Sequence, residues 1–277
     1  MAKSFQFSSE IRSFYEQYDE SSRLASNVFQ LEYARTQEIL LRYLPRPPAV
    51  ILDVGGGPGV YACWLAQRGY EVHLVDPVPL HLEQARQRSA QQPAGPIAGF
   101  TLGDARQLDF AEGSAHAILL LGPLYHLIER SDRILALREA LRVLHPGGVL
   151  CAAIISRFAS ALSGLFQGLL HDPTFAAIIR NDLRDGQHRN PTGNVMYFTE
   201  AYFHRPEELA EEIAQAGLQH EHTVAIEGVG WLLQNFEDWW SDEKCRTHLL
   251  EIIRHLESDS SLLGASAHLI GIARKKS

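Results

Sequence analysis

The stretch VILDVGGGPGVY, residues Val50 to Tyr61, decides the fold of this chain. An apolar run with an aspartate near its end reads as a buried strand, and four glycines and a proline follow it at once. A strand, a glycine-rich turn and the start of a helix form a nucleotide-binding unit, because backbone N–H groups face the ligand and glycines permit its close approach. The stretch therefore predicts a nucleotide site in an α/β domain.

The residues that follow repeat this rhythm of strand and helix. Such alternation predicts a parallel sheet with crossover helices. The expected strands are AVILDV (49–54), EVHLVD (71–76), IAGFTLGD (97–104), AHAILLL (115–121) and GVLCAAII (148–155). A helix is expected from Ser131, capped there or at Asp132 and stopped by residues 146–148, and another is expected from Pro206 to Gly217.

We expect residues 1–277 to form one domain with four parts. Residues 46–155 are the cofactor-binding core, and aromatic-rich residues 1–45 form an N-terminal helical lid. The rhythm breaks over residues 156–205, which predicts an insertion above the strand ends on the substrate side. Residues 206–277 complete the sheet and its helices, ending in the strand-like run SAHLIGIAR.

Composition excludes some classes of protein. The chain has 277 residues, a formal charge of −8 and no long basic run, which disfavours a nucleic-acid partner. Its three cysteines have no metal-ligand spacing, as is typical of a reducing cytosol. Neither a secretion signal nor a membrane-spanning apolar run is evident. We therefore expect a cytoplasmic protein.

The spacing of the glycines and the charge beside them select the ligand. Dinucleotides favour G-x-G-x-x-G, whereas this turn reads G-x-G-x-G and has Val60 at the sixth position. Asp53 lies two residues before Gly55, where its carboxylate would repel a pyrophosphate but attract ammonium and sulfonium groups. This combination indicates S-adenosylmethionine.

Aspartates also end the next two expected strands. Asp76, 21 positions after Gly55, suits a carboxylate that accepts hydrogen bonds from ribose hydroxyls, in NAD as well as in S-adenosylmethionine. Asp104 could accept from the adenine amine while the backbone of Ala105 contacts the ring edge. Asp109 is interpreted as a solvated turn residue. Three strand ends would thus bring three aspartates to one crevice.

The motifs LDVGGGPG, VHLVDP, GDA, ILLLGPLYHL and ALRVLHPGGVL resemble those of the class I S-adenosylmethionine-dependent methyltransferases of the small-molecule type. The resemblance implies a Rossmann-like, seven-stranded, mostly parallel sheet with helices on both faces and the last strand antiparallel. It also implies that a tyrosine and an arginine of the N-terminal lid, Tyr18 and Arg23, lie near the carboxylate of the cofactor. For Tyr15, a place in this site and a place packed on the core are equally expected. The implied cofactor-binding residues are Gly55, Gly57, Gly59, Asp76, Pro77, Asp104 and Leu121.

Candidate catalytic residues follow the fourth strand. His126 is the candidate general base and Tyr125 a possible partner of the acceptor, although either side chain could simply pack. Loops above strand ends are where acceptors bind in α/β sheets. The candidate substrate-binding residues there are Arg157, which a salt bridge would explain equally well, and His188, Tyr197 and Tyr202. No spacing predicts a metal site.

The sequence therefore predicts methyl transfer from S-adenosylmethionine to a small organic acceptor, with S-adenosylhomocysteine as the product, in a monomer or homodimer. An NAD(P)-dependent oxidoreductase is the alternative enzyme, disfavoured by Val60 and Asp53. A non-catalytic domain that binds a cofactor or a partner also remains open. The identity of the acceptor is not predicted.

Overall fold

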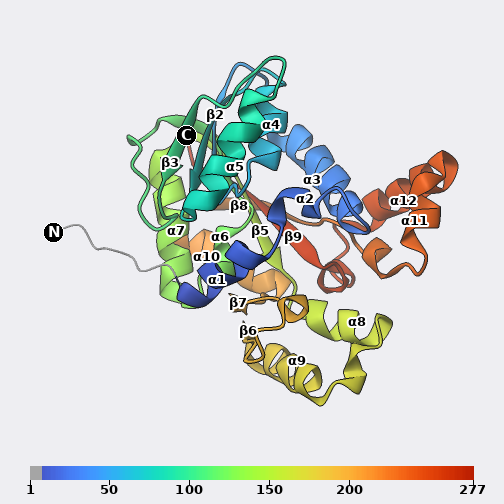
Figure 1. The fold of residues 1–277 in the computed structure, drawn as a ribbon. Helices are drawn as coiled ribbons and strands as arrows, with labels where there is room; N and C mark the ends of the chain where they lie inside the picture. The colour runs from blue at the N-terminus through green and yellow to red at the C-terminus, as the bar shows by residue number, and fades with distance from the viewer. Residues whose placement is uncertain (1–7) are drawn as a thin grey trace.

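The computed structural model of this chain describes residues 8–277 and contains one seven-stranded sheet. The strand order is β3-β2-β1-β4-β5-β9-β8. Only β9 is antiparallel to its neighbours β5 and β8. The predicted mostly parallel sheet is therefore confirmed (Figure 1). Its strands are β1 (Val50–Val54), β2 (Glu71–Asp76), β3 (Gly99–Leu102), β4 (Ala115–Leu120), β5 (Leu144–Ile155), β8 (Gln219–Ala225) and β9 (His268–Arg274).

Helices cover both faces of the sheet, because alternate side chains of its buried strands point to opposite faces. Ile51 belongs to the apolar cluster shared with α3, α4 and α5, whereas Leu52 belongs to the cluster shared with α7 and α10. The layer on the first face consists of α3 (Phe29–Tyr43), α4 (Val60–Ala66) and α5 (Pro79–Ala90). The layer on the second face includes α7 (Arg130–Val143) and α10 (Pro206–Ala216), and the short α6 (Pro123–His126) follows β4.

The remaining helices lie beside this core (Figure 1). In the N-terminal segment, α1 (Ser9–Gln17) and α2 (Glu20–Arg23) precede α3, and residues 1–7 of the predicted helical lid lie outside the described residues. The insertion forms a lobe from α8 (Ala159–Phe166), η1 (Leu169–His171), α9 (Pro173–Asp185), β6 (Gln187–His188), η2 (Val195–Tyr197) and β7 (Ala201–Tyr202). Between β8 and β9 lie η3 (Gly230–Leu232), α11 (Phe236–Ser241), α12 (Glu243–Leu256) and η4 (Leu263–Ala265).

Several boundaries differ from the sequence-based expectations. Helix α7 begins after Glu129 rather than at Ser131 or Asp132 and ends at Val143, and β5 begins at Leu144. Residues 146–148 therefore lie inside β5, where the register against β4 shifts, and do not themselves stop the helix. Strand β8 was not predicted, because this outermost strand is mostly polar and only its last residues are buried.

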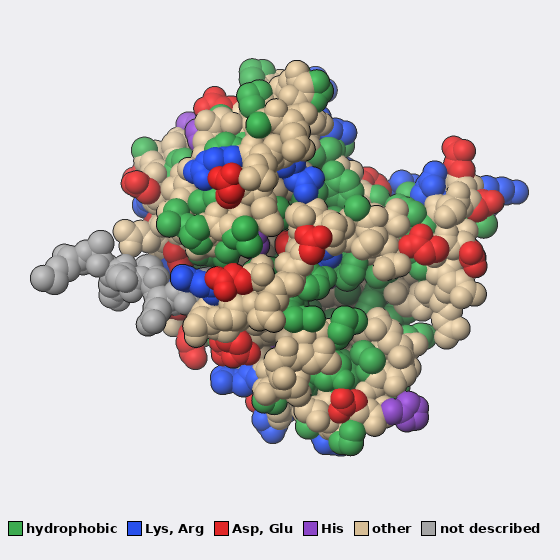
Figure 2. Space-filling view, in the orientation of Figure 1, with side chains coloured by type: hydrophobic (Ala, Val, Ile, Leu, Met, Phe, Trp, Pro, Cys, Tyr) green, Lys and Arg blue, Asp and Glu red, His purple; other side chains and the backbone are tan. Residues whose placement is uncertain are grey.

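The surface of the described residues shows no sign of a membrane span or of a basic tract on the face in view. No helix within residues 8–277 combines the length and the apolar character needed to cross a bilayer. Acidic and basic side chains are interspersed on the face shown in Figure 2. This distribution offers no extended positive patch there for a phosphate backbone.

Gly59 lies where the glycine turn packs closely against α5. Its φ is +77°, and a Cβ there would lie 2.9 Å from the Cβ of Ala85 in α5. Gly113 has a similar φ of +64° but open space around it. Gly113→Ala should therefore cost only the left-handed backbone penalty of about 1–2 kcal/mol, whereas Gly59→Ala should cost about 1–3 kcal/mol more through overpacking.

Urea denaturation of the two variants measures this difference in the free energy of unfolding. Equal losses in both variants would show that α4 and α5 do not require a glycine at their contact.

Candidate functional site

A cavity lies at the edge of the sheet where the parallel strands end. It begins at the glycine turn and the ends of β2 and β3, and it continues past β4 and β5 to the start of β9. The N-terminal segment closes its outer side. Its lining residues are Tyr15, Glu20, Arg23, Leu24, Glu32, Thr36, Asp53–Pro58, Val60, Tyr61, Asp76–Val78, His81, Gly103–Ala105, Leu121–Pro123, Tyr125–Leu127, Ala153, Ile226 and His268.

The glycines of the turn serve different purposes. A Cβ on Gly55 would lie 2.7 Å from the ring of Pro123, and one on Gly56 would lie 2.7 Å from Asp53. Gly57, with φ +55°, faces open space, since its Cβ would have no neighbour closer than 4.0 Å. Gly59 was predicted to bind the cofactor, but it does not line the cavity and instead packs against α5. Gly57 is therefore the glycine that permits close approach of a ligand.

Asp53 is the buried charge at the mouth of the turn. Its side chain is 1% exposed, and Oδ2 has no hydrogen-bond partner although it is buried. Burial, and then the nearby carboxylate of Asp76, raise the pKa of Asp53 to about 7. A buried carboxyl without a partner for one oxygen is costly in the free protein. A bound cation would relieve that cost.

Asp76 joins the glycine turn to the end of β2. Its Oδ2 accepts from the N–H of Gly57 at 2.9 Å, and its Oδ1 accepts from the N–H of Val78 at 2.9 Å. Oδ1 also lies 3.1 Å from Nδ1 of His81, whose buried Nε2 has no partner. Each carboxylate oxygen has two lone pairs, so Asp76 retains capacity to accept from a ligand hydroxyl.

The third strand end is held by an ion-pair network. Both oxygens of Asp104 accept from the guanidinium of Arg106, at 2.9 and 2.7 Å, and Arg106 also reaches Asp132 at 2.6 Å. Asp104 is thereby oriented before any ligand binds. The predicted residues Ala105, Pro77 and Leu121 also line the cavity.

Tyr15, not Tyr18, is the lid tyrosine that lines the cavity. Tyr18 follows the end of α1, stacks on Phe14 with ring centroids 5.1 Å apart, and does not line the cavity, so its contact with the cofactor stays a prediction. The two tyrosines diverge because the chain becomes extended at Tyr18. Sequence spacing alone did not reveal this change.

Arg23 lines the cavity as predicted, but two glutamates already bind it. Its Nε donates to Glu20 at 2.8 Å, and its two terminal nitrogens donate to Glu32 at 2.6 and 2.9 Å. A guanidinium has five N–H donors, so two remain for a ligand carboxylate. The trio of Arg23, Glu20 and Glu32 carries one net negative charge, which makes this side of the cavity acidic.

The two candidate catalytic residues on α6 also line the cavity. His126 is enclosed: Nε2 lies 2.8 Å from the hydroxyl of Tyr15, and Nδ1 lies 3.4 Å from the carbonyl of Glu200. The carbonyl only accepts, which assigns the ring proton to Nδ1 and makes Nε2 the acceptor from Tyr15. Burial lowers the pKa of His126 to about 4. Burial likewise raises the pKa of Tyr125, whose phenol stays protonated at neutral pH.

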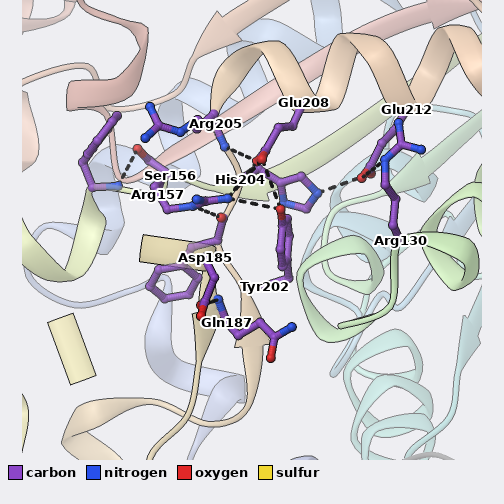
Figure 3. Close-up of polar contacts among 12 residues, drawn as sticks. Arg130, Ser156, Arg157, Asp185, Gln187, Tyr202, His204, Arg205, Glu208 and Glu212 are labelled. Atoms are coloured by element: carbon purple, nitrogen blue, oxygen red, sulfur yellow. Dashed lines mark hydrogen bonds and ion pairs between the residues drawn. The ribbon is translucent and has the colours of Figure 1, made fainter. Parts of the chain in front are cut away.

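The four candidate substrate-binding residues do not line the cavity, and neither does any other residue of the insertion. Arg157 is buried and belongs to a polar network between the insertion and α10 (Figure 3). Its guanidinium donates to the carbonyl of Phe203 at 2.7 Å, to Glu208 at 3.0 Å and to the hydroxyl of Tyr202 at 3.1 Å. Arg157 and Tyr202 therefore attach the insertion to the core.

His188 and Tyr197 are bound within the insertion lobe itself. His188 is 2% exposed, with Nδ1 2.9 Å from Asp182 and Nε2 2.7 Å from the carbonyl of Tyr197. The hydroxyl of Tyr197 donates to Asp172 at 2.5 Å. The prediction from loop position was wrong for these residues because their polar groups satisfy one another instead of facing a ligand.

The structure adds cavity residues that sequence reasoning missed. They come from distant segments: Glu32 and Thr36 lie on α3, Ile226 follows β8, and His268 begins β9. Glu32, Glu227 and His268 place potential ligand atoms within 4.8 Å of one another, a grouping that could hold a metal ion. No local motif joins residues this far apart, so only the fold could reveal them. His81 also lines the cavity, and the sequence could have indicated it, because it follows Asp76 by only five positions.

The geometry agrees with what comparisons with known proteins find. Residues 51–148 match the family described as "Methyltransferase domain". The chain is 36% identical over 106 residues to the methyltransferase GfsG of Streptomyces halstedii, covering 38% of this chain and 37% of that protein. It is 30% identical over 129 residues to a ubiquinone biosynthesis O-methyltransferase of Methylocella silvestris, covering 44% of this chain and 48% of that protein. The matched stretches thus span less than half of these relatives.

A solved structure shares the fold over a larger part of the chain. A SAM-dependent methyltransferase of Methanosarcina mazei matches 86% of this chain and 97% of its own, with a TM-score of 0.58 and 18% identity. The sequence matches fall on the strands and turns that build the first half of the cavity. Residues 51–148 therefore match a methyltransferase domain, and the chain shares its fold with a solved SAM-dependent methyltransferase.

Proposed function

We propose that this chain binds S-adenosylmethionine in the cavity and transfers its methyl group to a small organic acceptor. The observation that carries the proposal is the buried, unpartnered Oδ2 of Asp53, next to Gly56, in a cavity that the open position of Gly57 also lines. A cradle of this kind accepts a cationic ligand at close range and disfavours a pyrophosphate. The acidic strand ends at Asp76 and Asp104 line the same cavity and support the proposal.

The chain's own part in the reaction is to position and enclose the reactants. Bound S-adenosylmethionine supplies a methyl group on a positively charged sulfur, which is already activated as a leaving group. Holding the acceptor in line with that methyl can contribute about 7–11 kcal/mol to lowering the barrier. Residues of α1, α2 and α3 line the outer side of the cavity.

A small acceptor suits the second half of the cavity, beyond β4. Its lining there combines the apolar side chains of Leu24, Ala153 and Ile226 with the polar side chains of Glu32, Thr36, Tyr61 and His268. An enclosed site of this composition is typical of small-molecule pockets. One relative is named a ubiquinone biosynthesis O-methyltransferase, which supports an organic hydroxyl compound as one kind of acceptor.

Asp76→Asn tests the cofactor assignment. The amide oxygen can still accept from Val78, but the amide nitrogen cannot accept from the N–H of Gly57. Loss of a charged acceptor costs about 1.5–3 kcal/mol, so S-adenosylhomocysteine affinity should fall roughly 10- to 150-fold in calorimetry. Asp109→Asn, at an exposed aspartate outside the cavity, should bind as the wild type does.

Three results would contradict the proposed function. They are a wild-type protein that binds neither S-adenosylmethionine nor S-adenosylhomocysteine, tighter binding of NADH than of either, and equal affinities in the two aspartate variants.

Asp53 predicts a proton coupled to binding. Its pKa of about 7 means that its carboxyl is about half protonated in the free protein at neutral pH. A positively charged ligand favours the carboxylate, so binding should release protons near pH 7 and affinity should fall as pH drops below it. Calorimetry at pH 7 in buffers of different ionisation enthalpy measures this release, and Asp53→Asn should remove it.

The raised pKa of Asp53 also makes the stability of the free protein depend on pH, in the direction opposite to the ligand affinity. A carboxyl whose pKa is raised on folding contributes stability at low pH that is lost as pH rises toward 7.

In the binding experiment, identical proton release in wild type and Asp53→Asn would assign the coupling to another group.

Tyr15→Phe tests closure by the N-terminal segment. The variant removes the hydroxyl that lies 2.8 Å from His126, a hydrogen bond worth about 1 kcal/mol. Trypsin should therefore cleave at Arg12 and Arg23 faster in the S-adenosylhomocysteine complex of the variant than in that of the wild type. Tyr18→Phe is the matched control, because Tyr18 lies outside the cavity lining, and its cleavage rate should be unchanged. Equal cleavage of both variants would show that the Tyr15–His126 contact does not hold the lid.

A further inference from the structure

His268 stands at the end of the cavity that lies farthest along the sheet from the glycine turn. It is the first residue of β9 and pairs with Ile155, the last residue of β5. Because β9 is antiparallel to β5, its first residue reaches the edge where the parallel strands end. His268 lines the cavity there, alongside Ala153 of β5 and Ile226 after β8.

Glu227 fixes the orientation of the His268 ring. The carboxylate is 2% exposed, and Oε1 lies 2.6 Å from Nδ1 of His268. Its Oε2 accepts from the backbone N–H of His268 at 3.0 Å and from the Ser266 hydroxyl at 2.9 Å. A carboxylate only accepts, so Nδ1 carries the proton that it donates to Glu227. In the neutral ring, Nε2 is then the free base, and it makes no hydrogen bond to residues 8–277.

The charges around the ring come from three segments. Glu227 follows β8, Glu32 lies on α3, and Arg23 of α2 donates to both oxygens of Glu32. Burial on its own would lower the pKa of His268, but Glu227 and Glu32 outweigh it and raise that pKa above its ordinary value. His126 differs from His268 in two ways: both of its ring nitrogens have hydrogen-bond partners, and its pKa is lowered.

We propose that His268, oriented by Glu227, is the general base that takes the proton from the methyl acceptor, which is an uncharged hydroxyl compound or a cationic amine. The proposal rests on the proposed function. The acidic groups Glu20, Glu32 and Asp53 that line the cavity disfavour a carboxylate or phosphate acceptor. Glu227 is a positioning residue, because it acts through the ring of His268.

The step balances as follows. A hydroxyl acceptor gives up its proton as its oxygen bonds to the methyl carbon, whereas a cationic amine must give up a proton first so that its nitrogen has a lone pair for that bond. In both cases the carbon–sulfur bond breaks with its electron pair remaining on sulfur. The proton of the acceptor passes to Nε2 of His268, and the resulting imidazolium is stabilised by Glu227 and Glu32. Release of that proton to solvent restores the neutral base.

The same side chains could instead bind a metal ion, since Glu32, Glu227 and His268 have potential ligand atoms within 4.8 Å of one another. The existing contacts favour the proton-transfer role. Both oxygens of Glu32 already accept from Arg23, and both oxygens of Glu227 accept from Ser266 or His268. A metal ion would compete with these bonds for the same oxygens and would lie close to the positively charged guanidinium of Arg23.

The first experiment does not depend on knowing the acceptor. The ring of His268 is titrated by NMR in the S-adenosylhomocysteine complex of the full chain, in the wild type and in Glu227→Gln, with His268→Asn to assign its signal. We expect a pKa above about 6.5, the ordinary histidine value, and a clear decrease in Glu227→Gln. A pKa that is the same in wild type and Glu227→Gln, or broadening of the signal by added Mn²⁺ at low concentration, would overturn the proposal.

The second experiment measures turnover against a panel of neutral phenols and primary amines, which separates the two acceptor types. His268→Asn should lower kcat by about 10²- to 10⁴-fold while its affinity for S-adenosylhomocysteine stays at the wild-type value. In the wild type, kcat should rise with pH through the pKa of His268, because the neutral ring is the base. Glu227→Gln should move that rise to lower pH. His222→Asn, at an exposed histidine outside the cavity, should keep the wild-type profile.

The outcomes separate this inference from the proposed function. If the wild type binds S-adenosylhomocysteine and turns over an acceptor, but His268→Asn does so equally well, the inference alone fails. If the wild type binds neither S-adenosylmethionine nor S-adenosylhomocysteine, the proposed function fails first. If no member of the panel reacts, the titration of His268 in Glu227→Gln decides the inference.

Discussion

The carboxylate of Asp76 is the interaction on which the site depends. It lies at the end of β2 and is 3% exposed, yet it accepts from the backbone of the glycine turn and from the backbone at the start of α5. These bonds add to the pairing of β1 with β2 and tie the glycine turn to the start of α5. The turn can then keep Gly57 in a left-handed conformation with its open face toward the cavity. Buried charge-assisted hydrogen bonds of this kind orient a loop before a ligand arrives.

Charge is distributed unevenly along the cavity. Its first half holds Asp53, Asp76 and Asp104 at three strand ends, and Asp53 has an oxygen without a partner. The lid adds Glu20 and Glu32, which Arg23 neutralises only in part. An acidic, partly enclosed site strengthens the attraction of a cationic ligand, because little water is present to screen it. On the function proposed above, the same charge would disfavour an anionic acceptor in the second half.

The insertion supports the site without lining the cavity. Arg157 and Tyr202 bind it to α10, and His188 is enclosed by Asp182 and the Tyr197 backbone. Its contact with the site is indirect: the carbonyl of Glu200 lies 3.4 Å from His126, and the Phe198 ring packs on Phe14 of α1. The insertion therefore braces the lid and α6, while α3, β5 and β9 contribute residues to the lining of the cavity.

The sequence by itself determined most strands of the sheet and the residues at the glycine turn and the strand ends that line the first half of the cavity. Strand and helix periodicity, the glycine spacing and the aspartates at strand ends are local patterns, so Asp53, Gly57, Asp76 and Asp104 could be assigned before the fold was known. Only the tertiary structure decided that Tyr15 and not Tyr18 faces the cavity, and that Arg157 is a structural ion pair. It also brought Glu32, Glu227 and His268 together from α3, the loop after β8 and the start of β9. The physical reason is that turn chemistry acts over a few residues, whereas the lining of a cavity depends on how distant segments pack and satisfy their polar groups.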